Sequence, residues 1–215
     1  MEALAQLHRA SDLVEPRPAG RWDLEALRGR LTELVGGATS ANVSVASRLM
    51  VQAQRAGELV AWVASHRDAF FPPDLAAAGV DLQALLVIWA VEPEVARPAP
   101  GERSAVRATR SAERMIRSGA CGLVIIDLAR ELSISTAAQG RLLRLAEQHK
   151  SHVLILRRAR SDGNYSGTLV SVRGESSRER VAPGRFTCTI TNTKDKREGP
   201  GWTVSEEFNG PPGLY

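Results

Sequence analysis

Short, almost continuously apolar runs alternate with longer segments of helical period through most of the chain, and this alternation restricts the fold more than any other feature. Strands that are apolar on both faces are typical of a parallel sheet covered by helices on each side. Their alternation with helices predicts βαβ units and therefore a three-layer α/β/α core with a mostly parallel sheet. The expected strands are residues 31–35, 59–64, 85–89, 122–126 and 153–156, and the expected helices are residues 44–56, 73–78, 103–118 and 136–149.

The pattern changes after about residue 160, where no helical period can be followed. The predicted strands of an antiparallel C-terminal extension are residues 168–173, 186–191 and 202–205. Segments 90–101, 161–166 and 174–184 are polar or rich in Pro and Gly, and we expect them to be loops. Loops that follow strand ends are where ligands usually bind in open α/β sheets.

The chain of 215 residues suits one main domain with a short appended arm. A helix at residues 2–10 and a linker with Pro16 and Pro18 form the expected N-terminal arm, residues 1–20. The expected core covers residues 21–206, and residues 207–215 are the expected tail.

Composition argues against a membrane protein and against a metal site. The chain is 43% hydrophobic and 24% charged, with no apolar run near the ~20 residues that span a bilayer. The N-terminus shows no signal-peptide pattern, so we expect a cytoplasmic, nucleoid-associated location. Cys121 and Cys188 are expected to be free buried thiols, and the histidines lack the spacing of metal ligands.

Positive charge is concentrated in one part of the chain. The net charge is +4, but residues 141–198 carry thirteen Lys/Arg against six Asp/Glu. Such an asymmetry favours contact with nucleic acid or with an acidic partner surface.

The segment GGATSANVS at residues 36–44 has the position of a phosphate-binding loop but not its chemistry. A working loop reads G-x-x-x-x-G-K-[ST], with backbone N–H groups around the phosphates, a Lys on the β/γ-phosphates and a hydroxyl on Mg²⁺. Aligned on Gly36, with Gly37 next, the second Gly is Ala41, the Lys is Asn42 and the hydroxyl residue is Val43. The sequence therefore predicts a vestigial loop that binds no cofactor.

Several segments, taken in order, resemble the core of the RecA family. They are GRLTEL at 29–34, QAQRAG at 52–57, AGVDLQALL at 78–86, RSGA at 117–120 with GLVIID at 122–127, and TNTK at 191–194. The resemblance covers roughly residues 20–205 and implies a RecA-like fold in which Asp127 ends the Walker B strand.

Within this superfamily, the length and the lost nucleotide site are most similar to the ImuA family of translesion-synthesis accessory proteins. That resemblance implies partners: RecA itself, the polymerase-like ImuB, an alternative replicative polymerase, and single-stranded DNA as a further ligand. The SulA family of cell-division inhibitors is the second choice, and a single-stranded DNA-binding RecA paralogue is another alternative.

The resemblance also implies which catalytic groups are missing. The Glu that activates water falls on His66 or Arg67, with Asp68 as the nearest acid if the register shifts. The γ-phosphate sensor is replaced by Arg157 or Arg158. Because losing one charge-stabilising group costs roughly 10²-fold or more in rate, we expect no ATPase activity and a structural role for Asp127.

Two groups of arginines are the candidate partner or nucleic-acid surfaces. The first follows one face of the predicted helix 103–118, opposite its apolar face: Arg103, Arg107, Arg110, Arg114 and Arg117. The second is expected around the loops of the C-terminal half: Arg157, Arg158, Arg160, Arg173, Arg178, Arg180 and Arg185. A solvated outer face is the simpler interpretation of the first group, whereas loop positions favour a functional role for the second.

Overall fold

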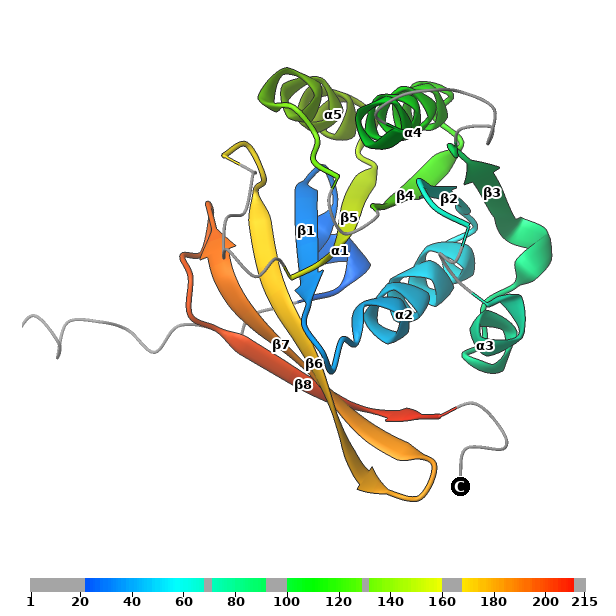
Figure 1. Cartoon of the computed structure of the whole chain (residues 1–215), viewed down its shortest axis with the longest axis vertical. Coiled ribbons are helices and arrows are strands. Elements are labelled where there is room, and N and C mark those ends of the chain that lie inside the picture. The colour runs from blue at the N-terminus through cyan, green and yellow to red at the C-terminus, as the bar shows by residue number, and fades with distance from the viewer. Residues whose placement is uncertain (1–21, 68–70, 92–99, 129–131, 160–167, 211–215) are drawn as a thin grey trace, which may run out of the picture.

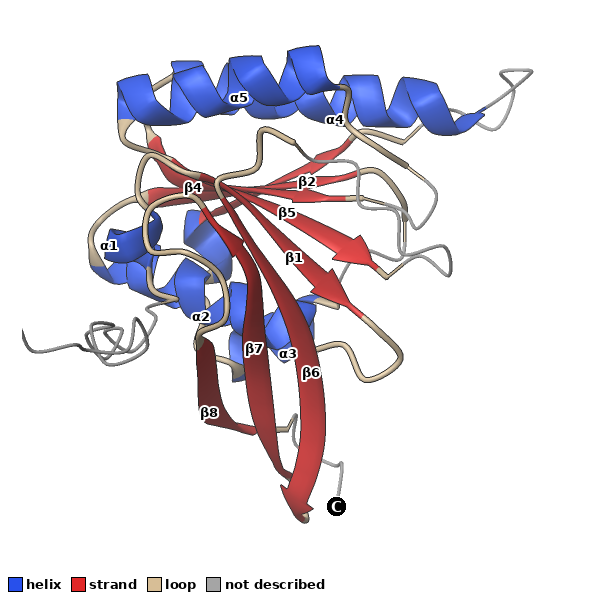
Figure 2. Cartoon of the chain, turned by 90° about the vertical axis from the view of Figure 1, so that its left-hand side faces the viewer, coloured by secondary structure: helices blue, strands red, loops and turns tan. Residues whose placement is uncertain are grey.

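The computed structural model describes residues 22–67, 71–91, 100–128, 132–159 and 168–210. These residues form an eight-stranded sheet with helices on both faces, which confirms the α/β fold with a mostly parallel sheet (Figures 1 and 2). The strand order is β3-β2-β4-β5-β1-β6-β7-β8.

The six strands from β3 to β6 run parallel, and the last two pairings are antiparallel. The five strands expected in the parallel sheet are all present, with ends shifted by at most two residues. Their bounds are β1 Leu31–Gly36, β2 Leu59–Ala64, β3 Leu85–Trp89, β4 Cys121–Asp127 and β5 His152–Arg158, followed by β6 Val172–Ala182, β7 Arg185–Asp195 and β8 Thr203–Asn209.

The helices divide between the two faces of the sheet (Figure 2). One face carries the short α1 (Leu24–Leu27), α2 (Asn42–Arg55) and α3 (Pro72–Ala77). The other face carries α4 (Pro100–Arg117) and α5 (Thr136–His149). A 3₁₀ turn, Leu82–Ala84, precedes β3.

Each helical layer encloses its own apolar core, as the two-faced apolar strands require. Leu49 and Met50 of α2 pack with Leu34, Trp62 and Ile125 on one face. On the other face, α4 contributes three small side chains to the core, Ala105, Ala108 and Ala112, and one large side chain, Ile116. Small residues let this helix lie close to the sheet.

The C-terminal extension differs from the expectation. Residues 174–184 were expected to be a loop, but most of them belong to β6, and residues 168–171 lie outside the strand. The first strand of the extension is also parallel, because β6 pairs with β1 from Thr32↔Val172 to Gly36↔Ser176. β7 and β8 then pair in antiparallel fashion, and the far ends of the three strands extend beyond the helices (Figure 2).

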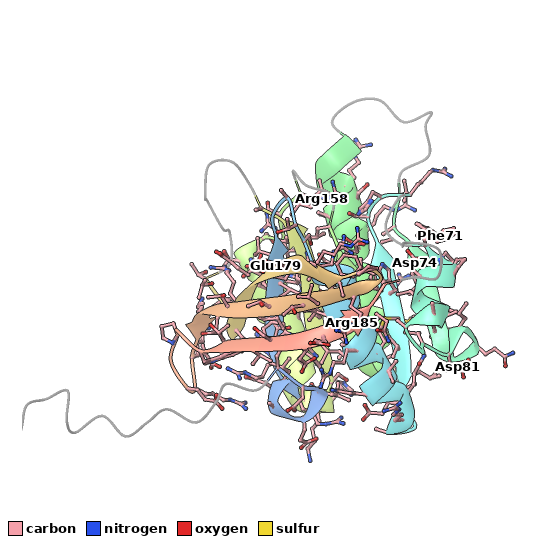
Figure 3. All side chains as sticks on the ribbon, turned by 90° about the horizontal axis from the view of Figure 1, so that it is seen from below. Phe71, Asp74, Asp81, Arg158, Glu179 and Arg185 are labelled. Atoms are coloured by element: carbon pink, nitrogen blue, oxygen red, sulfur yellow. The ribbon has the colours of Figure 1, made fainter. Side chains whose placement is uncertain are left out.

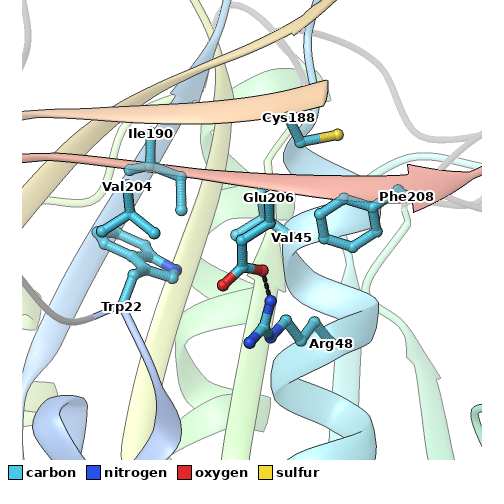
Figure 4. A pocket seen from close by; sticks show the side chains of 8 residues that line it. All are labelled: Trp22, Val45, Arg48, Cys188, Ile190, Val204, Glu206 and Phe208. Carbon is cyan, nitrogen blue, oxygen red and sulfur yellow. Dashed lines mark ion pairs between the residues drawn. The ribbon is translucent and has the colours of Figure 1, made fainter. Parts of the chain in front are cut away.

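The inner side of the extension packs against α2 (Figure 4). Alternate β8 residues, Val204, Glu206 and Phe208, are half-buried there, while the residues between them are exposed. A narrow cleft separates these side chains from Val45 and Arg48 of α2, and the ion pair between Arg48 and Glu206 crosses it. This packing makes the extension part of the core.

Two further expectations need correction or fall outside the described residues. The boundary expected between residues 206 and 207 lies inside β8, which ends at Asn209. The helix expected at residues 2–10 lies outside the described residues. Cys121 and Cys188 are free and buried, as predicted.

Candidate functional site

The loop between β1 and α2 lies at the edge of the sheet where the parallel strands end. Residues 37–41 connect the last residue of β1, Gly36, to the first residue of α2, Asn42. Because β1 lies between β5 and β6 in the sheet, the loop lies beside the ends of three strands. This is the position where α/β folds of this class bind phosphates.

The loop folds back on its own start. A Cβ built on Gly36 would lie 1.9 Å from Ser40 Oγ, so only glycine allows Ser40 to pack at this point. The Ser40 hydroxyl also accepts a hydrogen bond from the backbone N–H of Asn42, at 3.2 Å. One N–H group that a working loop would offer to a phosphate is therefore bound to the loop itself.

β6 holds the loop from the other side. Ser176 Oγ accepts from the backbone N–H of Ala41 at 3.1 Å and donates to Asn42 Oδ1 at 2.7 Å. The N–H of Arg178 donates to the carbonyl of Thr39 at 2.7 Å. Strand β6 therefore supplies partners to the backbone and to the side chain at the positions where a phosphate would bind.

Asn42, at the position of the phosphate-binding Lys, is a structural residue. Its amide Nδ2 donates to the carbonyl of Arg157 at 2.8 Å, so the side chain joins α2 to the end of β5 as well as to β6. It is 7% exposed. The next residue, Val43, presents an apolar and 38% exposed side chain where a Mg²⁺-binding hydroxyl would lie.

The N-terminus of α2 has no side-chain cap, with Ala41 at the N-cap position. Its remaining N–H groups and the helix dipole keep a general attraction for anions. The loop lacks the ammonium group and the metal-binding hydroxyl that would select a triphosphate over other anions.

Asp127, the last residue of β4, faces His66 rather than an open site. His66 Nε2 lies 3.4 Å from Asp127 Oδ1. Burial raises the pKa of Asp127 above its ordinary value, and the neighbouring His66 opposes this rise. A carboxylate that is harder to ionise and already paired is a poorer Mg²⁺ ligand than a free one.

His66, one of the two residues that align with the water-activating Glu, thus directs its imidazole at the Asp127 carboxylate. Arg67, the alternative residue for that position, is exposed. Asp68 lies outside the described residues. Asp127, for which a structural role was expected, therefore contacts a side chain of the chain itself, His66.

Arg157 is not a surface residue, and this corrects its place in the second basic group. It is 4% exposed, its Nη1 lies 3.2 Å from Glu33 Oε1, and its Nη2 donates to the carbonyl of Leu132 at 3.1 Å. Glu33 itself is buried in β1 and also binds Arg173 Nε through Oε2, at 2.6 Å. Burial of a carboxylate requires such partners, so Glu33 joins β1, β5 and β6.

The remaining described residues of the second basic group are spread over β5, β6 and β7. Arg158 is exposed at the end of β5, while Arg185 lies on β7 in the extension (Figure 3). Arg178 lies over the ring of Phe186, with the guanidinium carbon 4.9 Å from the ring centroid. Arg180 is exposed, and Arg160 lies outside the described residues. The exposed members on the extension therefore belong to strands rather than to the expected loops.

The first basic group lies together on the outer face of α4. All five of its arginines are exposed, opposite the apolar residues of the same helix that face the sheet. Within the described part of the chain, no ion pair involves any of them.

Ser40, Ser176 and Glu33 were not among the site residues predicted from the sequence. Glu33 carried a signal, because an acidic residue inside an otherwise apolar strand requires a buried positive partner. Ser176 carried none, since its role depends on the pairing of β6 with β1.

Two absences concern the described residues alone. They contain no group of three His, Cys, Asp or Glu side chains that could hold a metal ion. None of their helices is both long and apolar enough to span a membrane.

Comparisons with known proteins place the fold. The chain is 32% identical over 149 residues to protein RecA of Kineococcus radiotolerans, covering 66% of this chain and 37% of that protein. It is 36% identical over 117 residues to protein RecA of a Nocardioides species, covering 54% of this chain and 29% of that protein. The matches therefore span about a third of the length of these curated relatives. No protein-family model matches the chain.

A solved structure extends the likeness beyond the matched sequence. The RadB recombinase superposes with a TM-score of 0.58 over 83% of this chain and 87% of that chain, at 14% sequence identity. The fold is RecA/RadB-like, as the sequence motifs implied.

Proposed function

We propose that this chain is a non-catalytic RecA-like protein that acts by binding other macromolecules in the response to DNA damage. The observation that carries the proposal is the closed phosphate loop. Ser40 and Ser176 take the N–H groups of Asn42 and Ala41, and the Asn42 amide is bound on both of its polar atoms. A triphosphate would have to displace these bonds without gaining the contacts of a Lys or a Mg²⁺ ion.

Magnitudes support a loss of ATPase activity. Removing one group that stabilises developing charge costs roughly 10²-fold or more in rate. The loop lysine, the metal-binding hydroxyl and the water-activating acid are replaced by Asn42, Val43 and either His66 or Arg67. Several such losses together remove any useful rate of hydrolysis.

The test is a titration with Mg²⁺ and a fluorescent ATP analogue, together with a phosphate-release assay with and without single-stranded DNA. We expect no saturable Mg²⁺-dependent binding and no release above a mock preparation. Inorganic phosphate is the control for general anion binding at the α2 N-terminus. Phosphate release that Asp127→Ala abolishes would contradict the proposal.

The narrower part of the proposal is an ImuA-like accessory role in translesion synthesis, in the cytoplasm and at the nucleoid. The partners we propose are RecA, ImuB and an alternative replicative polymerase. Partial identity to protein RecA and a recombinase-like fold support this role. A chain with that fold can imitate a RecA subunit that does not complete an ATP site.

This role is tested by adding the purified chain to a strand-exchange reaction catalysed by RecA. We expect the rate of exchange to change with the molar ratio, since an imitating subunit would enter or cap the RecA assembly. An unchanged rate at severalfold molar excess would contradict a direct action on RecA. Binding of the chain to immobilised ImuB is measured separately. Binding to ImuB with an unchanged exchange rate would indicate a role with the polymerase alone.

A further inference from the structure

The outer face of α4 presents a straight row of positive charge, which we call the arginine row: Arg103, Arg107, Arg110, Arg114 and Arg117. Their spacing of three and four residues keeps all five on one side of the helix. At 1.5 Å per residue the row is about 21 Å long. It lies on the face of the molecule formed by α4 and α5 (Figure 2), whereas the closed loop lies at the strand ends.

Fold stability does not explain the row. The contacts of α4 with the sheet come from the opposite side of the helix, through residues such as Ala108, Ala112 and Ile116. The acid beside the row, Glu113, is turned toward α5, where it lies 2.8 Å from Arg141 Nε. On α5, the exposed Arg144 and the exposed Glu147 contribute opposite charges to the same face.

We propose that the arginine row binds the phosphate backbone of a nucleic acid. Nucleic-acid interfaces are polar and strongly positive, and arginine forks are suited to phosphate oxygens. One strand carries a charge per ~3.4 Å of axial length, so a row of about 21 Å spans about six phosphates. This goes beyond the proposed function, which rests on the closed loop and on protein contacts.

An acidic protein is the competing occupant, and the composition of the face argues against it. Protein interfaces have an apolar centre in which charged residues other than arginine are depleted and aromatic residues are enriched. Among the described residues of α4, Val106 is the large apolar side chain that is exposed, at 50%. A convex row of arginines with one valine offers no apolar centre for a protein partner to bury.

The test measures the binding of the full chain to a labelled 20-nucleotide single strand and to a labelled 20-base-pair duplex. Fluorescence anisotropy is recorded between 50 and 300 mM salt, and the two probes separate single-stranded from double-stranded sources of the same phosphate chemistry. Contacts to phosphates make log K fall with log salt by about 0.7 per contact for a single strand and about 0.9 for a duplex.

The variant Arg110→Gln/Arg114→Gln removes two contacts from the middle of the row. It should reduce affinity roughly tenfold or more near 100 mM salt and make the salt slope shallower by about 1.4 to 1.8. The matched control is Arg55→Gln/Arg197→Gln, which makes the same charge change at exposed residues on α2 and after β7. The control should bind within about twofold of the unchanged chain, and far-UV circular dichroism should show all variants folded.

Several results would overturn the proposal. They are no binding of either probe by the unchanged chain, an equal loss in the control, or binding that survives the α4 substitutions but disappears with Arg158→Gln. A chain that ignores both probes but binds a polyglutamate peptide through the row would assign the surface to an acidic protein.

Discussion

Asn42, which aligns with the lysine of a working phosphate loop, is held by hydrogen bonds to distant parts of the chain. A lysine at this position holds a positive charge that must face a ligand or water, whereas an amide carries no charge and can be buried with its bonds made. Its partners are the carbonyl of Arg157 and the hydroxyl of Ser176. The sequence predicts the loss of the lysine, but not the bonds, because both partners are distant along the chain.

The partners of Glu33 show that a pattern of charges in the sequence does not predict which arginines are exposed. Counting arginines assigned Arg157 and Arg173 to a surface, yet both bind this buried carboxylate. Their local sequence does not distinguish them from the exposed Arg158. The distinction depends on which side of a strand faces the core.

We predict that Glu33→Ala lowers the free energy of unfolding by about 3–5 kcal/mol, because it leaves the buried Arg157 and the partly buried Arg173 without their carboxylate. Chemical denaturation measures the change. The matched control is Glu207→Ala, whose exposed carboxylate lies 3.7 Å from Arg185 Nη1 and should contribute less than about 1 kcal/mol. Equal effects of the two substitutions would contradict a stabilising role for Glu33.

His152 makes stability depend on pH. It is fully buried, its Nε2 lies 2.6 Å from Thr32 Oγ1, and burial, with a smaller effect of Arg30, lowers its pKa to about 3. The unfolded chain takes up a proton near pH 6.5, while the folded chain does not. The stabilising contribution is therefore complete above pH 6.5 and is lost as pH falls toward 3.

Because of His152, the free energy of unfolding should fall by about 2 kcal/mol from pH 7 to pH 5, at roughly 1.4 kcal/mol per pH unit below 6.5. The measurement is denaturant unfolding of the unchanged chain and of His152→Gln at both pH values. The variant is expected to be less stable at pH 7 but to lose less on acidification. Parallel pH dependences would show that His152 does not carry the effect.

At the level of elements, the parallel strands were predictable and the extension was only partly so. Strands β1 to β5 are mostly apolar, so a local pattern identifies them. The β6 sequence VRGESSRERVA is mostly polar, since one of its faces is exposed and its far end projects from the core. What makes it a strand is pairing with β1, which is distant in the sequence, and with β7, which follows it after the turn at Pro183 and Gly184.

Gly174 tests how closely β6 packs between its neighbours. A Cβ at this position would lie 2.7 Å from Ile190 Cγ2 on β7 and 3.1 Å from the ring of Trp22. We predict that Gly174→Ala lowers the free energy of unfolding by about 1–3 kcal/mol through overpacking.

The control for this prediction is Gly37→Ala in the loop, where a Cβ would meet nothing within 4 Å. That substitution should change the free energy of unfolding by less than about 0.5 kcal/mol. Both variants are compared by thermal or denaturant unfolding. A neutral Gly174→Ala would mean that β6 can shift away from β7, and the packing described for the extension would then be wrong.

At the level of the whole molecule, the fold resembles that of recombinases, whereas we propose a function without their catalytic site. The RecA/RadB-like fold follows from its strands and order of motifs, and the structural likeness to the RadB recombinase supports the same fold. The site that defines catalysis in such a fold is filled by residues of the chain itself. We propose that binding surfaces, foremost the outer face of α4, carry the function instead.

The most direct test of the closed loop is a crystal structure of the full chain grown with saturating Mg²⁺ and a non-hydrolysable ATP analogue. The account predicts that Ser40, Asn42 and Ser176 keep the hydrogen bonds described here and that no triphosphate occupies the loop. An ordered triphosphate with Mg²⁺ between residues 36 and 43, with the Ser176 contacts broken, would contradict it.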